Sequence, residues 1–267
     1  MYILLDIGGT NTRIAFSKTG EKIDEIVRLK TLSNFDDALR EVEMLIKERL
    51  EGSILGVGVG IAGPLDKEHT KTDNAPNLPL WNDKPLKLRL EEITQAPVVL
   101  DNDCVLAGIG EAQYGAGKGD SIVVYMTIST GVGGARIVNG MPDVSAHGFE
   151  PGHQILVVNG ENISLEKLVS GTALEKRYGK KAEDIEDERV WQEVVRYLSV
   201  GLNNTLVYWS PDKIVLGGSV MNKISLDLLE QKFKETVFIF PEVPPIEKAV
   251  LDEPVLWGAL ALASQKK

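Results

Sequence analysis

The sequence predicts an α/β protein made of two similar halves. Predicted strands alternate with predicted helices along the 267 residues, a pattern that is typical of the α/β class. A strand, a glycine-rich turn and a second strand occur at residues 2–16 and again at residues 122–138, and a constant shift superposes Gly8 on Gly131. Two such halves facing each other would enclose a cleft, which is the usual place for a small-molecule site.

The composition excludes several classes of protein. Hydrophobic residues make up 43% and charged residues 25% of the chain, which excludes a disordered protein and fits one large or two modest domains. The formal net charge is −10 and no basic stripe is visible, which argues against a nucleic-acid partner. The single cysteine, Cys104, can form neither an internal disulfide nor a zinc site of several cysteines.

No segment of the sequence suggests a membrane protein. The longest run of apolar residues and glycines, residues 54–63, is far shorter than the roughly 20 residues that span a bilayer. Asp6 and Arg13 interrupt the N-terminal apolar stretch, so we expect no signal peptide. The sequence therefore predicts a soluble, cytoplasmic protein without a membrane partner.

Hydrophobic periodicity locates the elements of the first half. Apolar residues recur at helical spacing from Asn34 to Leu50, with Asn34 as the N-cap and Gly52 as the stop signal. Shorter apolar runs bounded by turn residues predict strands. The predicted strands are residues 2–7, 12–16, 54–61 and 97–100, and the further predicted helices are residues 86–95 and 104–114.

The second half repeats this alternation. Strands are predicted at residues 122–128, 134–138 and 213–216. The chain from Ser164 onward is predicted to be mostly helical, with its longest helix at residues 189–209 and a closing helix at residues 254–264.

Two glycine motifs do not fit known nucleotide sites. Residues 58–63 match G-x-G-x-x-G, but Pro64 and a polar loop follow where a dinucleotide site needs the start of a helix. Residues 115–119 resemble part of a P-loop, but they lack its first glycine and the Ser or Thr that should follow Lys118.

The turn after the first strand carries a more specific pattern. Asp6 ends an apolar strand, so its carboxylate would lie at the edge of the sheet, where it can hold Mg²⁺ directly or through water. Gly8, Gly9 and Thr10 follow and can point N–H and hydroxyl groups at a phosphate. Thr130 begins a second glycine turn of the same kind, without the acid. An ordinary hairpin turn is the alternative interpretation of each.

Two further clusters allow two interpretations each. Asn102 or Asp103 can cap the helix that follows, or one of the neighbouring carboxylates can act as a general base. His147, Glu150 and His153 have H-x-x-E-x-x-H spacing, but the intervening glycines and proline prevent the helix that such a metal site needs. Hydrogen bonds to a polyhydroxyl ligand, or contacts that tie the loops together, suit these residues better.

A series of short motifs runs in order along nearly the whole chain. The motifs are Asp6-Ile-Gly-Gly-Thr-Asn11, Gly60-Ile-Ala-Gly-Pro-Leu65, Asn77-Leu-Pro-Leu-Trp81, Asn102-Asp103, Gly110-Glu111, Thr130-Gly-Val-Gly-Gly134, Glu150-Pro-Gly-His153, Leu165-Glu-Lys-Leu-Val-Ser-Gly-Thr-Ala173 and Leu216-Gly-Gly-Ser219. The ordered set resembles the ROK family of sugar kinases, repressors and related proteins, and it is far more specific than any single motif. The resemblance implies the actin-like, ribonuclease-H-type fold, with two α/β domains around a cleft.

The resemblance also implies roles for individual residues. Asp103 would be the catalytic base, and Asp6 would hold Mg²⁺ directly or through water. The phosphates of ATP would be bound by the loops that contain Asp6, Gly8, Gly9, Thr10, Asn11, Thr130 and Gly131, and the adenosine end by Gly217 and Gly218. Sugar hydroxyls would be bound by Asn77, Asn102, Asp103, Glu150, His153 and Glu166.

The implied activity is the ATP-dependent phosphorylation of a hexose, with glucose to glucose 6-phosphate as the leading reaction. The alternative sugars are N-acetylmannosamine, N-acetylglucosamine and fructose. A repressor of the family would carry a DNA-binding domain ahead of this body, and a sugar-binding protein without catalysis would not need both Asp6 and Asp103. The resemblance further implies a homodimer. We expect a small domain of residues 1–103 with 254–267 and a large domain of residues 104–253.

One segment departs from the family pattern. The family commonly has a C-x-C-G-x-x-G-C zinc motif after the Gly-His pair, whereas residues 159–164 contain no cysteine. We therefore expect no structural zinc, which leaves open how His153 is held.

Overall fold

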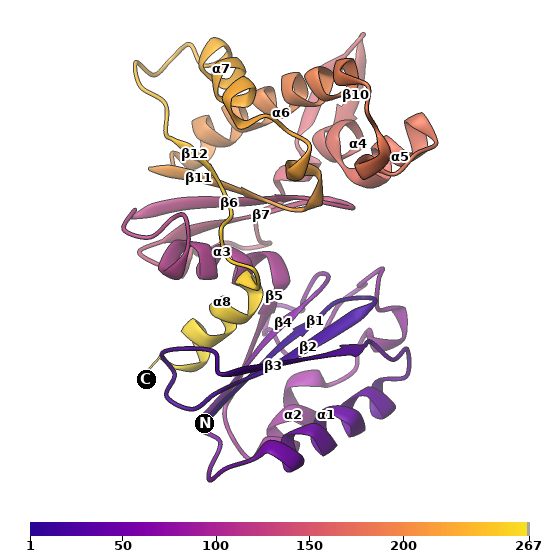
Figure 1. The fold of residues 1–267 in the computed structure, drawn as a ribbon, viewed down its shortest axis with the longest axis vertical. Coiled ribbons are helices and arrows are strands. Elements are labelled where there is room, and N and C mark those ends of the chain that lie inside the picture. The colour runs from indigo at the N-terminus through magenta and orange to yellow at the C-terminus, as the bar shows by residue number, and fades with distance from the viewer. Residues whose placement is uncertain (266–267) are drawn as a thin grey trace. The chain divides into compact units, whose positions relative to one another are not determined.

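A computed structural model describes residues 1–265, and the chain divides into two compact units. Unit 1 comprises Met1–Gln113 together with the C-terminal segment from Asp252, and unit 2 comprises Tyr114–Leu251 (Figure 1). The chain therefore passes from one unit to the other twice, and unit 1 is completed only by the last helix.

Unit 1 is built on a five-stranded mixed sheet with the order β3-β2-β1-β4-β5. An antiparallel hairpin of β1 and β2 continues into β3, while β4 and β5 run parallel to β1. The strands are β1 (Tyr2–Ile7), β2 (Asn11–Ser17), β3 (Glu25–Lys30), β4 (Gly56–Ile61) and β5 (Val98–Asn102). Because parallel strands end at the same edge of a sheet, Asp6 of β1, Gly60 of β4 and Asp101 of β5 lie at one level across it.

Helices cover both faces of this sheet. The helices α1 (Phe35–Arg49) and α2 (Leu86–Thr94), with the short turn η1 (Pro79–Trp81), bury apolar side chains in a core with the sheet. The helix α8 (Pro254–Ala263) lies on the opposite face (Figure 1). The start of α3 (Asp103–Tyr114) lies beside it, because a Cβ atom on Gly60 of β4 would meet both Val255 and Leu106. The helix α1 begins as predicted, because the side chain of Asn34 accepts a hydrogen bond from the backbone N–H of Asp37.

Unit 2 has a second five-stranded sheet with a similar start. The antiparallel hairpin of β6 and β7 is again followed by strands parallel to its first member, and the order is β12-β11-β6-β7-β8. The strands are β6 (Ile122–Ile128), β7 (Val132–Val138), β8 (Met141–Pro142), β11 (Lys213–Gly217) and β12 (Ile246–Lys248). The repeated hairpin expected from the sequence is present in each unit.

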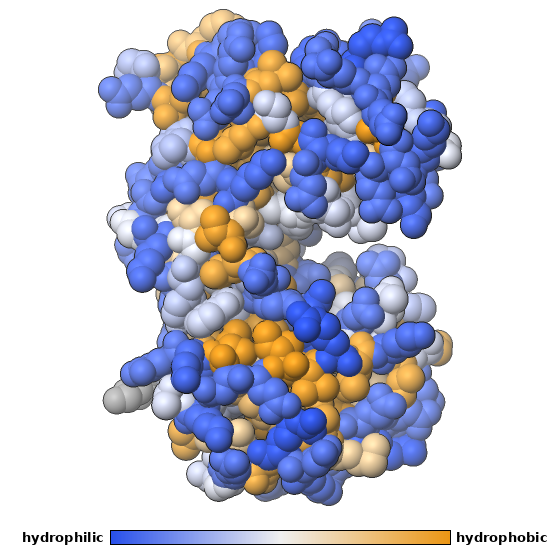
Figure 2. Space-filling view, in the orientation of Figure 1, coloured by the Kyte–Doolittle hydropathy of each residue, from blue (hydrophilic) through white to orange (hydrophobic). Residues whose placement is uncertain are grey.

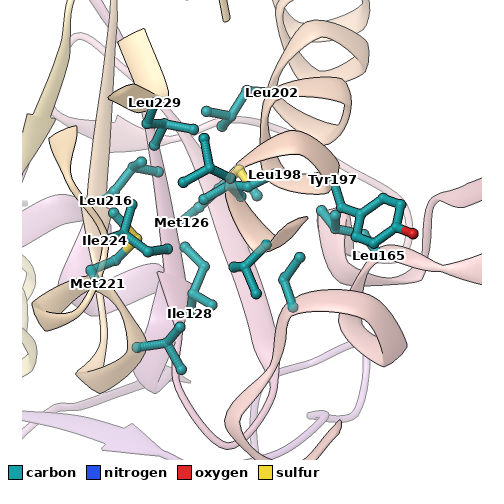
Figure 3. Close-up of a cluster of buried hydrophobic side chains, with 14 of the residues drawn as sticks. Met126, Ile128, Leu165, Tyr197, Leu198, Leu202, Leu216, Met221, Ile224 and Leu229 are labelled. Atoms are coloured by element: carbon teal, nitrogen blue, oxygen red, sulfur yellow. The ribbon is translucent and has the colours of Figure 1, made fainter. Parts of the chain in front are cut away.

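The helices of unit 2 bury a core of their own. Leu198 and Leu202 of the longest helix pack with Met126 and Leu216 of the sheet and with Leu165 (Figure 3). The remaining elements are η2 (Pro151–His153), β9 (Ile155–Val158), β10 (Glu161–Ser164), α4 (Leu165–Val169), α5 (Gly171–Tyr178), η3 (Ala182–Asp184), α6 (Glu188–Trp209), η4 (Ser219–Asn222) and α7 (Leu226–Thr236).

The boundary between the units differs from the expected one. Unit 1 runs through α3, beyond residue 103, because α3 packs tightly on α8. A Cβ atom on Gly258 would lie 1.9 Å from the carbonyl oxygen of Leu106, and one on Gly110 would lie 2.2 Å from that of Pro254. Only glycine allows so close an approach of two helix backbones.

The surface agrees with the composition. On the face shown in Figure 2, hydrophilic residues cover most of the surface and apolar residues form scattered patches. Within residues 1–265, every helix is too short or too polar to traverse a lipid bilayer.

Candidate functional site

Asp6 lies at the end of β1 and is only 7% exposed. Its register partner on β2 is Arg13, whose Nη1 lies 2.7 Å from Asp6 Oδ2. Arg13 is held in turn by Glu253, with its Nε 2.9 Å from Glu253 Oε2, and Arg28 Nη2 lies 2.5 Å from Glu253 Oε1. Burial raises the pKa of Asp6, and the Arg13 guanidinium opposes that rise. A carboxylate that is both buried and ion-paired is therefore fixed at the sheet edge.

The turn between β1 and β2 is closed by its own backbone. The N–H of Gly8 donates to the carbonyl of Asn11 at 2.9 Å, and the hydroxyl of Thr31 donates to the carbonyl of Gly8 at 2.6 Å. A Cβ atom on Gly9 would lie 2.8 Å from Cβ of Asn77. The loop that carries Asn77 therefore packs on this turn, and Gly9, Thr10, Asn11 and Asn77 are exposed there.

Asp103 is the first residue of α3. Burial raises the pKa of Asp103 to about 6, and the negative charge of Asp6 contributes to the rise. The N–H of Cys104 donates to Asp103 Oδ1 at 2.8 Å and to Asn102 Oδ1 at 2.9 Å, so the carboxylate also helps to cap its helix. Both interpretations that the sequence allowed for Asp103, cap and candidate base, are compatible with this geometry.

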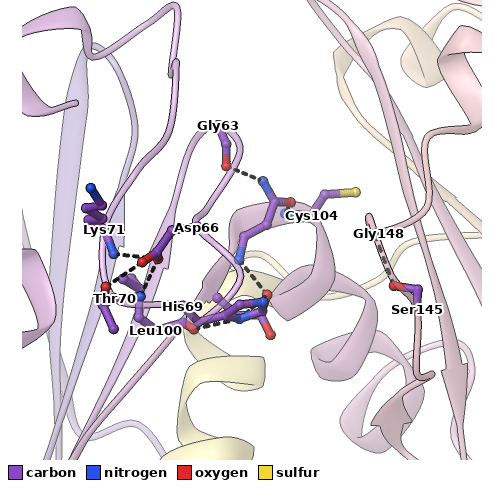
Figure 4. A network of polar contacts seen from close by, with 11 residues as sticks. Gly63, Asp66, His69, Thr70, Lys71, Leu100, Cys104, Ser145 and Gly148 are labelled. Carbon is purple, nitrogen blue, oxygen red and sulfur yellow. Dashed lines mark hydrogen bonds and ion pairs between the residues drawn. The ribbon is translucent and has the colours of Figure 1, made fainter. Parts of the chain in front are cut away.

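The amide of Asn102 is bonded at both ends within unit 1. Its Nδ2 donates to the carbonyl of Gly63 at 3.0 Å, and its Oδ1 accepts the bond from Cys104 (Figure 4). Asn102 thus joins the loop after β4 to the start of α3. It retains one amide hydrogen for a ligand.

His69, which no motif of the sequence marks, joins the same network. Its Nδ1 lies 3.3 Å from the carbonyl oxygen of Leu100 and 3.6 Å from Asp101 Oδ1 (Figure 4). Burial raises the pKa of Asp101. The loop of His69 is itself closed by Asp66, which accepts hydrogen bonds from Thr70. The loop that leads to Asn77 is therefore tied to the end of β5.

In unit 2, three glycine-containing segments converge at the turn between β6 and β7. The N–H of Gly171 donates to the carbonyl of Ser129 at 2.6 Å, and the N–H of Thr172 donates to that of Thr130 at 3.3 Å. A Cβ atom on Gly218, whose φ is +94°, would lie 2.3 Å from the carbonyl oxygen of Ile128. The predicted positions Thr130, Gly131 and Gly218 thus lie together, with Gly171 and Thr172 added by the structure.

Gly217 has a structural reason to be glycine. It is buried at the end of β11, and a Cβ atom there would lie 2.5 Å from the hydroxyl oxygen of Tyr125. Beside it, the hydroxyl of Ser219 lies 3.4 Å from that of Ser129. These two serines sit where the three segments meet. Ser219 belongs to the Leu216–Ser219 motif, but neither serine was predicted as a site residue.

Glu166 is held against the same turn. Its Oε2 accepts a hydrogen bond from the backbone N–H of Val132 at 2.9 Å, and a Cβ atom on Gly131 would lie 2.8 Å from that oxygen. The carboxylate projects from the first turn of α4, and the fold brings it next to Gly131 and Val132, which are distant in the sequence.

Glu150 and His153 flank the short turn η2. The N–H of His153 donates to the carbonyl of Glu150 at 3.1 Å. Partial burial raises the pKa of Glu150, the positive charge of His153 opposes the rise, and the charge of Glu166 adds to it. A Cβ atom on Gly152 would lie 2.2 Å from the carbonyl oxygen of Val132, so the turn sits directly on β7. Unit 2 therefore brings its three predicted sugar-binding residues into one neighbourhood.

The predicted site residues therefore form two groups. Unit 1 holds Asp6, Gly8, Gly9, Thr10, Asn11, Asn77, Asn102 and Asp103, and unit 2 holds Thr130, Gly131, Glu150, His153, Glu166, Gly217 and Gly218. Among residues 1–265, no group of three or more His, Cys, Asp or Glu side chains is arranged to hold a metal ion.

Comparisons with known proteins agree on one family. The ROK family profile matches residues 2–266. A putative fructokinase of Bacillus subtilis is 28% identical over 263 residues, which cover 93% of this chain and 84% of the relative. A glucokinase of Halalkalibacterium halodurans is 28% identical and is matched over 82% of this chain and 80% of its own length.

Solved structures match the chain over almost its full length. The ROK hexokinase of Thermus thermophilus superposes with a TM-score of 0.86 at 27% identity and covers 98% of this chain and 97% of its own. A ROK family glucokinase of Streptomyces griseus, solved with glucose and AMPPNP, superposes with a TM-score of 0.79 at 24% identity, and 99% of each chain is covered.

Proposed function

The chain belongs to the ROK family and is an ATP-dependent sugar kinase, and on that premise we propose that it phosphorylates the 6-hydroxyl of glucose. Its fold is the actin-like, ribonuclease-H-type α/β fold of that family. The observation that carries the proposal is Asp103, a largely buried carboxylate whose pKa is raised to about 6 at the start of α3.

Asp103 acts as the general base in this proposal. A base works best when its pKa lies near the operating pH, because it is then mostly ionised and still a competent proton acceptor. With a pKa of about 6, Asp103 meets both conditions in a neutral solution. It takes the proton of the sugar hydroxyl as the oxygen of that hydroxyl attacks the γ-phosphorus of ATP.

The residues of unit 1 fit a magnesium-bound nucleotide. Mg²⁺ in such sites is held by one or two carboxylates together with substrate phosphates and waters, so a cluster of three protein ligands is not needed. Asp6 supplies a carboxylate of this kind, and because its Oδ2 is paired with Arg13 we propose contact through water. When bound, Mg²⁺ neutralises charge on the phosphates.

The glycine turns supply the other phosphate contacts. Gly9, Thr10 and Asn11 in unit 1, and Thr130 and Gly131 in unit 2, are proposed to offer backbone N–H and side-chain hydrogen-bond donors. Gly8 contributes by shaping this turn, because its own N–H donates to the carbonyl of Asn11. Gly217 and Gly218 are proposed for the adenosine end, where Ser129 and Ser219 add hydroxyl groups beside them. Tight packing around Gly9 and Gly218 keeps these backbones in place.

The sugar is bound by side chains that both accept and donate. Glu150 and Glu166 accept hydrogen bonds from sugar hydroxyls, and His153 can donate or accept. Asn77 presents an exposed amide, whereas Asn102 offers only the amide hydrogen that Gly63 leaves unused. Each hydroxyl that is missing or inverted leaves one of these groups unpaired, at about 1–3 kcal/mol.

Fructose is the second candidate substrate. The Bacillus subtilis relative named a putative fructokinase is 28% identical and covers 93% of this chain, whereas the Halalkalibacterium halodurans glucokinase is 28% identical and covers 82%. We also propose that the enzyme is cytoplasmic, because ATP is its phosphoryl donor. We further propose a homodimer, and size-exclusion chromatography with light scattering would measure its mass.

A panel of sugars tests the function. Purified protein with ATP and Mg²⁺ is given glucose, fructose, N-acetylglucosamine, N-acetylmannosamine and a matched pentose control, and ADP release is followed. We expect glucose to give the highest kcat/KM and the product to be glucose 6-phosphate. A higher kcat/KM for fructose selects the second candidate, and ADP release that no sugar stimulates contradicts the kinase assignment.

A further inference from the structure

Gln154 follows His153 directly and joins three parts of unit 2. Its Nε2 donates to the carbonyl of Pro151 at 2.8 Å, and its Oε1 accepts from Asn204 Nδ2 at 2.8 Å. Its backbone carbonyl accepts from the N–H of Leu165 at 2.9 Å. Because the carbonyl of Pro151 can only accept, the amide nitrogen of Gln154 must face it, and this fixes the direction of the bond to Asn204.

Further contacts connect this segment with Glu150, His153 and Glu166, the residues of unit 2 that are proposed to bind the sugar. Leu165, which donates to Gln154, precedes Glu166, and Glu166 accepts from the N–H of Val132. Gly152, in the turn between Glu150 and Gln154, packs against the carbonyl oxygen of Val132. Contacts thus connect η2 with α4, α4 with β7, and β7 with η2, and the side chain of Gln154 adds the bond that ties this set of contacts to α6.

This set of contacts is attached to the buried core of unit 2. Asn204 lies on α6, which buries much of its length in the core, and Leu165 is fully buried in that core beside Leu198 (Figure 3). A Cβ atom on Gly201 of α6 would lie 3.4 Å from Gln154 Nε2. The side chain of Gln154 therefore packs against α6 as well as bonding to it.

We propose that Gln154 is a positioning residue that fixes Glu150, His153 and Glu166 for sugar binding, an inference that rests on the proposed function. It supplies through hydrogen bonds the local support that a zinc-binding cysteine motif would otherwise give this segment. Between Gln154 and Leu165 the chain forms only the β9–β10 hairpin, whose strands are paired by backbone bonds and closed by Asn159 and Gly160.

Three variants and a control test this role. Gln154→Ala removes both side-chain bonds, Asn204→Ala removes one of them, and the double variant removes the same set as Gln154→Ala alone. Asn203→Ala is the matched control, because it removes a neighbouring amide from the same helix. The readouts are the KM values for glucose and for ATP, kcat, and hydrogen exchange of the backbone amides in residues 150–166.

We expect Gln154→Ala to raise the glucose KM about tenfold and to leave the ATP KM within about twofold. The double variant should match Gln154→Ala, because the bond between Asn204 and Gln154 is already lost when Gln154 alone is replaced. Exchange should quicken in residues 150–166 and stay unchanged in residues 213–217. The control Asn203→Ala should alter none of these values.

Three results would overturn the inference. They are equal increases in the two KM values, effects of Gln154→Ala and Asn204→Ala that simply add in the double variant, and unchanged exchange in residues 150–166. If the wild type phosphorylates no sugar, the proposed function fails on its own. Hydrogen exchange then still decides whether Gln154 anchors this segment. If Gln154→Ala does not fold, the milder Asn204→Ala variant carries the same comparisons.

Discussion

A carboxylate that serves as a base near neutral pH needs an environment that resists its ionisation, and Asp103 has one. Burial and the charge of Asp6 raise its pKa from 3.8 to about 6, while the N–H of Cys104 favours the charged form. The folded protein therefore binds the proton of the Asp103 carboxyl group more tightly than the unfolded chain does. Ionisation of Asp103 consequently lowers the stability of the fold as the pH rises from about 4 to above 6.

The first prediction at this scale combines activity and stability. Asp103→Asn should lower kcat by roughly 10²–10⁴-fold and leave the sugar affinity nearly unchanged, because asparagine can cap the helix but cannot accept the proton. At pH 8 the same variant should also be more stable than the wild type. Its free energy of unfolding should be higher by up to about 3 kcal/mol, and its melting temperature should rise accordingly. The difference should vanish below about pH 4, where aspartic acid is protonated in both states.

Kinetics and thermal melts across pH 4–8 check both parts. The wild-type kcat should fall as the pH drops through about 6, following protonation of the base. If Asp103→Asn has a near-normal kcat, Asp103 is not the catalytic base. If Asp103→Asn is less stable than the wild type at pH 8, the negative charge of Asp103 does not destabilise the fold.

Sequence patterns could point to residues only where the chemistry is local. Asp6 was predicted from the strand end and the glycine turn beside it, whereas the local pattern left Asp103 open between helix cap and base, and the family resemblance implied the base. Gln154 and His69 were not predicted, because their partners, Asn204 and Leu100, are distant in the chain and meet them only in the fold. A polar side chain with a remote partner leaves no periodic signal.

At the scale of elements, the contact between α3 and α8 determines where two functional segments lie. Asp103 begins α3, and Glu253, which holds Arg13, immediately precedes α8. The two helices approach closely at Gly110 and Gly258. A larger residue at either glycine would force the helices apart and move the ends that carry these groups.

The prediction for this contact is a steric one. Gly258→Ala would place a methyl group 1.9 Å from the carbonyl oxygen of Leu106, so the variant should lose about 1–3 kcal/mol despite the better helix propensity of alanine. A fall in melting temperature of roughly 5 °C is expected for a chain of this size.

Gly179→Ala is the matched control for Gly258→Ala. Gly179 has a φ of +68° but no atom within 4 Å of its Cβ position, so only backbone strain of about 1 kcal/mol is expected. A Gly258→Ala variant as stable as the wild type would show that the helices separate without cost.

Elements were predicted well where periodicity is strong. The helix from Phe35 to Arg49 has an unbroken apolar stripe and a capping asparagine, and the strands 2–7 and 122–128 are runs of apolar residues. The strand β3 was missed because it is a half-exposed edge strand with charged residues in it. The β9–β10 hairpin was missed although Asn159-Gly160 between two extended segments is a strong hairpin signal.

At the scale of the whole chain, two separate cores explain the organisation. The internal repeat predicted two halves, and each unit has its own hydrophobic cluster. The boundary between the units was harder to predict, because α3 follows the last strand of the first half in the sequence and was therefore assigned to the second half. Its attachment to unit 1 depends on contacts with α8, near the other end of the chain.

The last prediction is that the protein folds and works without zinc. Small domains need a metal when their core is too small to hold them together, whereas unit 2 buries an extensive apolar cluster around α6. The chain has one cysteine and three histidines, so a site of several cysteines cannot form. Elemental analysis should find well under one zinc per chain. A zinc chelator that spares Mg²⁺ should change neither kcat nor the melting temperature, whereas removing Mg²⁺ should abolish ADP release. One tightly bound zinc per chain, with a lower melting temperature after its removal, would mean that His153 and its neighbours are held by a metal rather than by the hydrogen bonds of Gln154.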